Sequence, residues 1–426
     1  MISIRTPWYY GWTIVAIAMA YLAIIYGIAI YGFTFWVPHW EADFGAGRGE
    51  IMLVFVAIQA GMAVFAVFAG RAADSLPIRW LVFAGSVCFA CGLALSAYAQ
   101  ALWQIGLIFS VTMVCGLLTA GSITAQTLTA RWFDRNSGMA LGIVSTGTSI
   151  GGLLMPLLMV FLQSSVGWRE ANLWLAGLVI VVIAPASLLI FDSPAKAGIK
   201  PTEQSHPATP NVKVEDHQDW SLRSILMTRA FWSMAFCFTV ISTIFIAIQQ
   251  NLAPLAQDKG ISAMAVSTAV AVMAFVMICA KLVFGYLADR VNLRYLYLCT
   301  VAALAAVLLI LNLNEITYPL LLVVTCLAGV ATGSSMPLSA SIIRRSFGPL
   351  SFGRVKGLMY TIISFSAIGP WVAGVIYDAT GGYETAWLVL GLLLVPAIFA
   401  SSGLSAKAAA RNLDKQPDVA STANNL

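Results

Sequence analysis

One lysine, Lys281, lies inside a long apolar stretch of the sequence, where a charged side chain is costly. In hydrocarbon an ammonium group costs several kcal/mol unless it faces water, an anion or an acid. The polar boundary that follows is marked by Asp289, about 12 Å further along a helix, so Lys281 does not simply extend to that boundary. The 18 acidic residues all lie in connections or at the ends of apolar stretches, so none is expected to neutralise it. This pattern indicates a functional cation that faces water or an anion.

Other polar side chains within apolar stretches are candidates to complete the same site. Tyr31 and Tyr360 are favoured, because a buried phenol needs a polar partner. For the Ser and Thr candidates a hydrogen bond to their own helix backbone is a competing interpretation. Gln249 lies near the end of its stretch, where a hydrated vestibule is an equally good interpretation. The predicted substrate-binding residues are Lys281, Tyr31, Tyr360, Thr119, Gln249, Ser335 and Ser364.

The composition predicts a membrane protein that positions these residues on helices. The 426 residues are 60% hydrophobic and 10% charged, with a mean hydropathy of +0.87, whereas soluble domains carry roughly 25% charged residues. The apolar stretches are about 20 residues long and lack period-two alternation, which favours membrane-spanning helices. Twelve spans are expected: Tyr10–Trp36, Ile51–Gly70, Trp80–Ala99, Leu102–Gln126, Gly138–Phe161, Asn172–Phe191, Phe231–Leu252, Ser262–Gly285, Arg294–Leu313, Tyr318–Ser341, Gly357–Tyr377 and Thr385–Leu404.

The chain contains an internal repeat. Gly70, Asp74 and Arg79 follow the second span with the same spacing that Gly285, Asp289 and Arg294 have after the eighth, at an offset of 215 residues (285 − 70). Repeats of this kind are typical of transporters built from two parallel halves. The predicted domains are a six-helix bundle over 1–191, a cytoplasmic linker over 192–229 with a short helix near Leu222–Thr228, a second six-helix bundle over 230–405, and a disordered cytoplasmic tail over 406–426.

The distribution of basic residues predicts the orientation in the membrane. Of the 23 Lys and Arg residues, only Arg48, Arg169 and Lys259 fall in connections on the side opposite the termini. Because cytoplasmic loops are enriched in Lys and Arg, both termini are expected in the cytoplasm. The protein is therefore expected to be a multi-pass protein of the inner (plasma) membrane.

The two Gly-x-x-x-Asp-x-x-x-x-Arg loops resemble the signature loop of the major facilitator superfamily. Within it the chain resembles the monocarboxylate porter family, which includes the bacterial oxalate/formate exchangers. The residues that carry this second resemblance are Tyr9-Tyr-Gly-Trp12, Tyr31-Gly-Phe33, Pro38-x-x-Glu41-x-Asp-Phe-Gly45-x-x-Arg48, Arg131-Trp-Phe133, Gly167-Trp-Arg169 and Arg229-Ala-Phe-Trp232.

This resemblance implies a fold and several residue roles. The implied fold is an all-α bundle of twelve transmembrane helices in two six-helix halves, and Lys281 stands where the family has a substrate-binding basic residue. Met277 stands where the family's proton-coupled members carry an Asp, so a relay through such an Asp is missing. The implied gating residues are Asp74, Arg79, Asp289, Arg290 and Arg294, where each Asp would cap a helix of the opposite half.

The expected function is secondary active transport of a small monocarboxylate by alternating access, with proton-coupled symport favoured and Lys281 as the proton carrier. The alternatives are an anion exchanger for aromatic or larger carboxylates and a non-transporting sensor. Phe33, Phe35 and Trp36 either line a pocket for an aromatic acid or form an interfacial belt, and His39 is interpreted as a surface histidine. No nucleophile constellation, metal cluster or phosphate-binding motif is present in the sequence, so we expect a protein that is not an enzyme and has no cofactor or metal. We also expect a monomer without a nucleic-acid partner.

Overall fold

The computed structural model describes residues 9–133, 137–194, 197, 222–313, 316–347 and 352–404, and within these ranges it is helical without strands. Within these ranges, ten helices are long and apolar enough to cross a membrane. One of them, the 52-residue α8 (Ser137–Leu188), covers two expected spans, which meet at Gly167, where φ is +81°. The last expected span is the shorter apolar segment Glu384–Ala400. All the predicted spans are thus helical. That the chain crosses the membrane twelve times stays a prediction.

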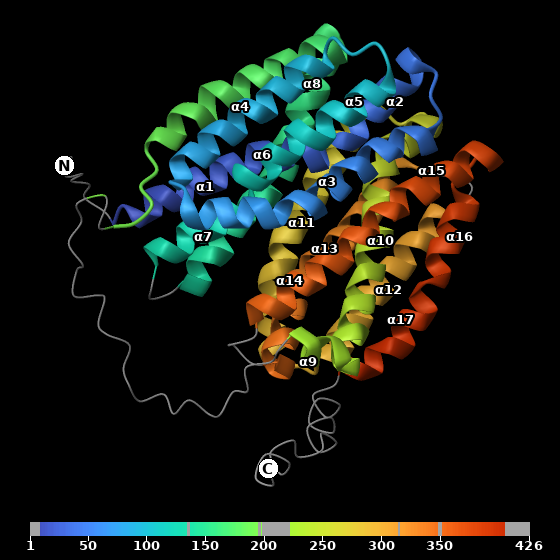
Figure 1. The fold of residues 1–426 in the computed structure, drawn as a ribbon. Coiled ribbons are helices and arrows are strands. Elements are labelled where there is room, and N and C mark those ends of the chain that lie inside the picture. Colours follow the sequence, from blue (N-terminus) through green and yellow to red (C-terminus); the bar gives the residue numbers. More distant parts are fainter. Residues whose placement is uncertain are drawn as a thin grey trace, which may run out of the picture.

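The first half of the chain forms one bundle, drawn from blue to green in Figure 1. Its helices are α1 (Gly11–Tyr26), the π-helix η1 (Gly27–Tyr31), α2 (Phe33–Phe44), α3 (Arg48–Ser75), α4 (Ile78–Ser96), α5 (Leu102–Ile108), the π-helix η2 (Phe109–Met113), α6 (Val114–Thr119), α7 (Ser122–Trp132) and α8.

The second half forms the other bundle, drawn from yellow-green to red (Figure 1). Its helices are α9 (Leu222–Met227), α10 (Arg229–Asp258), α11 (Ala263–Arg290), α12 (Leu293–Leu311), α13 (Tyr318–Phe347), α14 (Phe352–Ile363), the 3-10 turn η3 (Ser364–Ala367), α15 (Ile368–Thr380), α16 (Glu384–Leu392), α17 (Leu394–Ala400) and η4 (Ser401–Leu404). The short helix expected in the linker is α9; most of the linker and the whole predicted tail lie outside the described residues.

The internal repeat extends to the helix boundaries. Helices α3 and α11 each have 28 residues, and α4 and α12 each have 19. Their first residues are related by the offset of 215 found in the sequence (263 − 48 and 293 − 78), and α14 begins 215 residues after α8 (352 − 137). Equivalent positions in the two halves can therefore be compared directly.

The first bundle has a buried aromatic core, which includes residues that the sequence suggested for a pocket or an interfacial belt. The rings of Trp36 and Trp40 stack with centroids 5.6 Å apart, and Phe33 packs edge-on against both. Trp36 Nε1 donates a hydrogen bond of 2.9 Å to Oδ1 of the buried Asn172. Phe33 and Trp36 therefore form neither a substrate pocket nor an interfacial belt, because both are fully buried within their own half.

The main helix contacts between the two bundles are α8 with α11, α3 with α15 and the adjoining η3, and α2 with α10. The last two pairs meet at one end of the molecule, which we call the Arg48 end. At the opposite end α3 stops at Ser75 and α11 at Arg290.

Candidate functional site

Lys281 lies on α11 at the interface between the halves. Its ammonium group donates a 2.9 Å hydrogen bond to Oγ of Ser149 on α8, a fully buried residue of the opposite half. Among the described residues, Arg48 and Arg169 form ion pairs with carboxylates, whereas the contact of Lys281 is with this hydroxyl. The predicted cation is thus held across the interface by a neutral hydroxyl. The hydroxyl partner was missed in the sequence, where Ser149 is one of many small residues in its stretch.

Tyr31 belongs to the same interface. It is the last residue of η1, and a bulge of this type is frequent at functional sites. Its ring lies against Gly152, where an added Cβ would come within 2.8 Å, and its hydroxyl lies 3.6 Å from Sδ of Met277. Met277 is one helical turn before Lys281, and Gly152 is about one turn after Ser149. Tyr31 and Lys281 are therefore brought to the same region of the α8–α11 contact.

Gln249 is buried on α10, and its Nε2 atom has no hydrogen-bond partner. The neighbouring Gln250 donates a 3.2 Å hydrogen bond to the carbonyl of Ile30 in η1. Three residues further on, the amide of Ala253 donates to Oγ1 of Thr34 at 2.9 Å. The segment around Gln249 therefore fastens the second half to the first rather than forming a vestibule.

The smaller predicted residues form bonds within their own helices. The hydroxyl groups of Thr119, Ser335 and Ser364 donate to backbone carbonyls three or four residues earlier, at 2.7, 3.0 and 2.7 Å. Thr119 also lies against Gly85 of α4, where a Cβ would be only 2.1 Å from its oxygen. Tyr360 is half-exposed, with Nζ of Lys356 5.8 Å from its ring centroid. Lys356, expected in a loop, belongs to α14.

The predicted gating loops are partly described. The side chains of Asp74 and Asp289 lie outside the described residues. Arg79 stacks on Trp80 and Arg290 on Tyr286 in their own halves, while Nε of Arg294 is buried without a hydrogen-bond partner.

The ends of α3 and α11 accept equivalent hydrogen bonds from arginine side chains, which the sequence did not reveal. Arg131 donates to the carbonyl of Ala73, and Arg345 donates to the carbonyl of Ala288, at 2.9 and 2.6 Å. Ala73 and Ala288 are repeat equivalents (288 − 73 = 215).

Arg48, expected in a loop, is the first residue of α3 and is only 4% exposed. Two nitrogens of its guanidinium group donate to the two carboxylate oxygens of Asp258, both at 2.7 Å, and Nε donates to Glu41 at 2.8 Å. The group also lies over the ring of Tyr377, 3.9 Å from the centroid, and donates to the hydroxyl of Tyr383. Asp258, Tyr377 and Tyr383 belong to the second half, so Arg48 joins the halves through a bidentate ion pair.

A second carboxylate joins the halves at the start of the same helix. The backbone amides of Arg48 and Gly49 donate to Oδ1 and Oδ2 of Asp378, at 2.9 and 2.8 Å. The first amides of a helix lack acceptors within it, and an acid there is favoured by the helix dipole. Gly374 permits this approach, since a Cβ on it would lie 2.8 Å from the backbone of Arg48. The Arg48 end is therefore tightly closed.

Comparison with known proteins identifies what this arrangement resembles. The family model described as Major Facilitator Superfamily matches residues 17–254 and 251–421. Monocarboxylate transporter 11 of Mus musculus is 25% identical over 411 residues, covering 93% of this chain and 87% of that protein. The uncharacterized MFS-type transporter YcxA of Bacillus subtilis is 23% identical, with 88% of each chain covered. The crystal structure of a bacterial homologue of the human lysosomal transporter Spinster, inward-facing and unoccupied, superposes with a TM-score of 0.73 at 14% identity over 98% of this chain and 100% of that one.

Proposed function

The chain belongs to the Major Facilitator Superfamily, and from that premise we propose that it carries a small monocarboxylate across the inner membrane by alternating access. The names of the relatives, monocarboxylate transporters among them, support this substrate class. The observation that carries the proposal is the ammonium group of Lys281, held between the halves by a neutral hydroxyl and by no acid of the described chain.

Lys281 is the group that would recognise the substrate. A hydrogen bond from an ammonium group to a carboxylate is charge-assisted and stronger than one to a neutral hydroxyl. An arriving carboxylate therefore displaces Ser149 from Lys281. Because Ser149 and Lys281 belong to different halves, this exchange weakens one contact across the interface at the moment of binding. Tyr31, which lies at the same contact, is positioned to donate to the second carboxylate oxygen.

The Arg48 end forms the closed gate of this cycle. The excess of basic residues on the opposite side supports an orientation with the Arg48 end outside the cell. In that orientation the conformation corresponds to a carrier open toward the cytoplasm. For the substrate to enter from outside, the contacts of Arg48 with Asp258 and of Asp378 with α3 have to break. Alternation between the two states is then a rocking of the bundles around Lys281.

Uptake of radiolabelled lactate or pyruvate into proteoliposomes tests the proposal. Lys281→Ala should abolish uptake while leaving the yield of folded protein nearly unchanged, because it leaves no buried acid without a partner. Lys281→Arg should retain part of the activity, since it keeps the charge. The matched control is Lys259→Ala, an exposed lysine at the Arg48 end. Normal transport by Lys281→Ala would refute the assignment.

Symport with a proton is the favoured coupling, with Lys281 as the proton carrier. In symport, a pH gradient drives net uptake and a pH-sensitive dye reports proton movement into the vesicles. The alternative is anion exchange, in which uptake requires a carboxylate on the opposite side and proceeds equally without a gradient. A sensor that does not transport would bind a carboxylate without accumulating it.

A further inference from the structure

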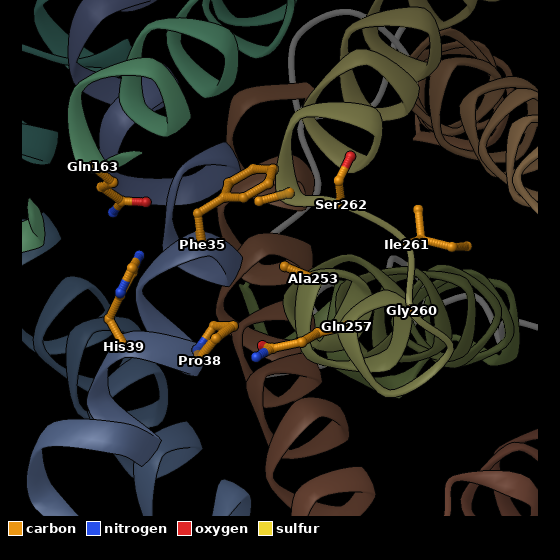
Figure 2. Close-up of a pocket in the computed structure, with 10 residues that line it drawn as sticks. Phe35, Pro38, His39, Gln163, Ala253, Gln257, Gly260, Ile261 and Ser262 are labelled. Atoms are coloured by element: carbon orange, nitrogen blue, oxygen red, sulfur yellow. The ribbon is translucent and has the colours of Figure 1, made fainter. Parts of the chain in front are cut away.

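A cavity of about 390 Å³ lies between the halves at the Arg48 end. Its walls come from α2, α8, α10 and the start of α11, and include Phe35, His39, Gln163, Gln257, Ser262 and Ala263. Figure 2 shows Gln163 and His39 together on one side and the turn that contains Gly260 on the other. The cavity is separate from the contacts of Lys281, and its size is that of a site for a small organic molecule.

The internal repeat shows what is missing from this cavity. The offset of 215 relates Arg48 and Gly49, whose amides bind the carboxylate of Asp378, to Ala263 and Met264 at the start of α11. The same offset, which also relates the first residues of α8 and α14, relates Asp378 to Gln163. One junction is therefore filled by a carboxylate from the opposite half, and its counterpart contains a neutral amide beside a cavity.

The polar groups around the cavity are donors that suit a carboxylate. Gln163 is only 6% exposed, and its Nε2 has no hydrogen-bond partner. The first amides of the 28-residue α11 have no acceptor within the helix, and the hydroxyl of Ser262 is engaged by the amide of Ala265. His39, interpreted from the sequence as a surface histidine, is half-buried beside Gln163.

The remaining surroundings suit a ligand with a small apolar part. Phe35, Pro38, Ala253 and Ile261 supply apolar walls. The acid that acts on His39 is Asp43, whose carboxylate accepts hydrogen bonds from Trp168 and Arg169, so its charge is largely offset.

We propose that this cavity is a second carboxylate site, in which a small aromatic acid bound to Gln163, to the start of α11 and to His39 takes the part that Asp378 plays in the equivalent junction. A bound acid connects α8 of the first half with α11 of the second. It therefore stabilises the state closed at the Arg48 end and inhibits transport without competing for Lys281. The proposal concerns a site independent of Lys281, and it can fail while the proposed function stands.

Benzoate is the probe, and its binding is measured by titration calorimetry on the purified full-length Lys281→Ala variant, in which the central site is removed. Ala263→Pro in that background removes one amide donor at the first helical position, where proline is well accommodated, and Ser262 already has an extended backbone (ψ 148°). Gln163→Glu replaces the amide donor by a charge of the wrong sign with little change in shape. Each change should weaken benzoate binding roughly tenfold or more, as expected for a lost hydrogen bond to a charged group.

The matched control is Arg229→Pro, the same kind of change at the exposed first residue of α10, which follows an extended Thr228 (ψ 134°) and lies far from the cavity; it should bind benzoate like its parent. Melting temperatures without ligand establish that each variant is folded, and Ala263→Pro decides the outcome if Gln163→Glu is not. Absence of benzoate binding in the Lys281→Ala protein would overturn the proposal. Equal benzoate affinities for Ala263→Pro and the Arg229→Pro control would overturn it as well.

Discussion

Replacing Asp258 by Asn should open the Arg48 end. In the closed state Asp258 receives two hydrogen bonds of 2.7 Å from Arg48 of the opposite half. The substitution keeps the shape of the side chain but removes its charge and one of the two acceptor oxygens. Since this pair crosses between the halves, the loss destabilises the closed state and leaves the open state almost unchanged.

The size of the effect follows from the surroundings of the pair. A hydrogen bond to a charged group contributes about 1.5–3 kcal/mol. The side chain of Asp258 is 31% exposed, so solvent screens the pair, and Glu41 still balances the charge of Arg48. The lower value of about 1.5 kcal/mol therefore applies, which changes the ratio of closed to open molecules roughly tenfold.

Distances between spin labels measured by pulsed electron paramagnetic resonance report this ratio. Labels on Ser165→Cys and Thr385→Cys, two exposed positions in different halves near the Arg48 end, are introduced after replacing the seven native cysteines. Asp258→Asn should raise the ratio of the longer-distance to the shorter-distance population about tenfold.

The matched control is Asp43→Asn. Asp43 is the repeat equivalent of Asp258 (258 − 43 = 215), but it pairs with Arg169 of its own half. Its loss should leave the distance distribution unchanged. The same distribution for Asp258→Asn and wild type, or an equal shift in both variants, would refute the role of the Arg48 pair as a gate.

Three further predictions follow from the same structure. Gly374→Ala places a Cβ 2.8 Å from the backbone of Arg48 and should also populate the open state in the spin-label measurement. The control is Gly142→Ala, whose added Cβ has no atom within 4 Å and which should leave the distances unchanged. The same proportion of closed molecules in both variants would contradict this prediction. Trp36→Phe leaves Oδ1 of the buried Asn172 without its donor and should destabilise the protein by about 1–3 kcal/mol, seen as a lower melting temperature; an unchanged melting temperature would contradict the importance of that bond. Benzoate binding should strengthen as the pH falls from 8 toward the pKa of His39, which burial holds below its usual value, because a carboxylate beside the imidazole favours its charged form. The other groups that face that side of the cavity are Asp43 and the neutral Gln163 and Gln257. His39→Gln should therefore remove the pH dependence.

Much of the architecture follows from the sequence because a lipid bilayer constrains it strongly. Backbone groups in hydrocarbon have to be paired within the segment, so each apolar stretch of sufficient length is a helix, and all the expected spans are helical. The repeat offset of 215 residues was visible in the sequence of two short loops, and it also relates the boundaries of α3 and α4 to those of α11 and α12. Lys281 was recognisable for the same reason, since an unpaired charge is conspicuous among apolar residues.

The partners of the charged residues were decided only by the tertiary structure. Arg48 looked like a loop residue because Asp258 and Asp378 are 210 and 330 residues away in the chain, and no local pattern links them. Ser149 could not be singled out as the partner of Lys281, since a small hydroxyl residue in a membrane helix usually bonds to its own backbone, as Thr119, Ser335 and Ser364 do. Hydropathy determines which segments become helices, but it does not distinguish the faces that meet a second bundle from those that meet lipid, because both are apolar. Which side chains lie between the bundles depends on how the two halves pack, and that packing places Lys281, Ser149 and Arg48 at the interface.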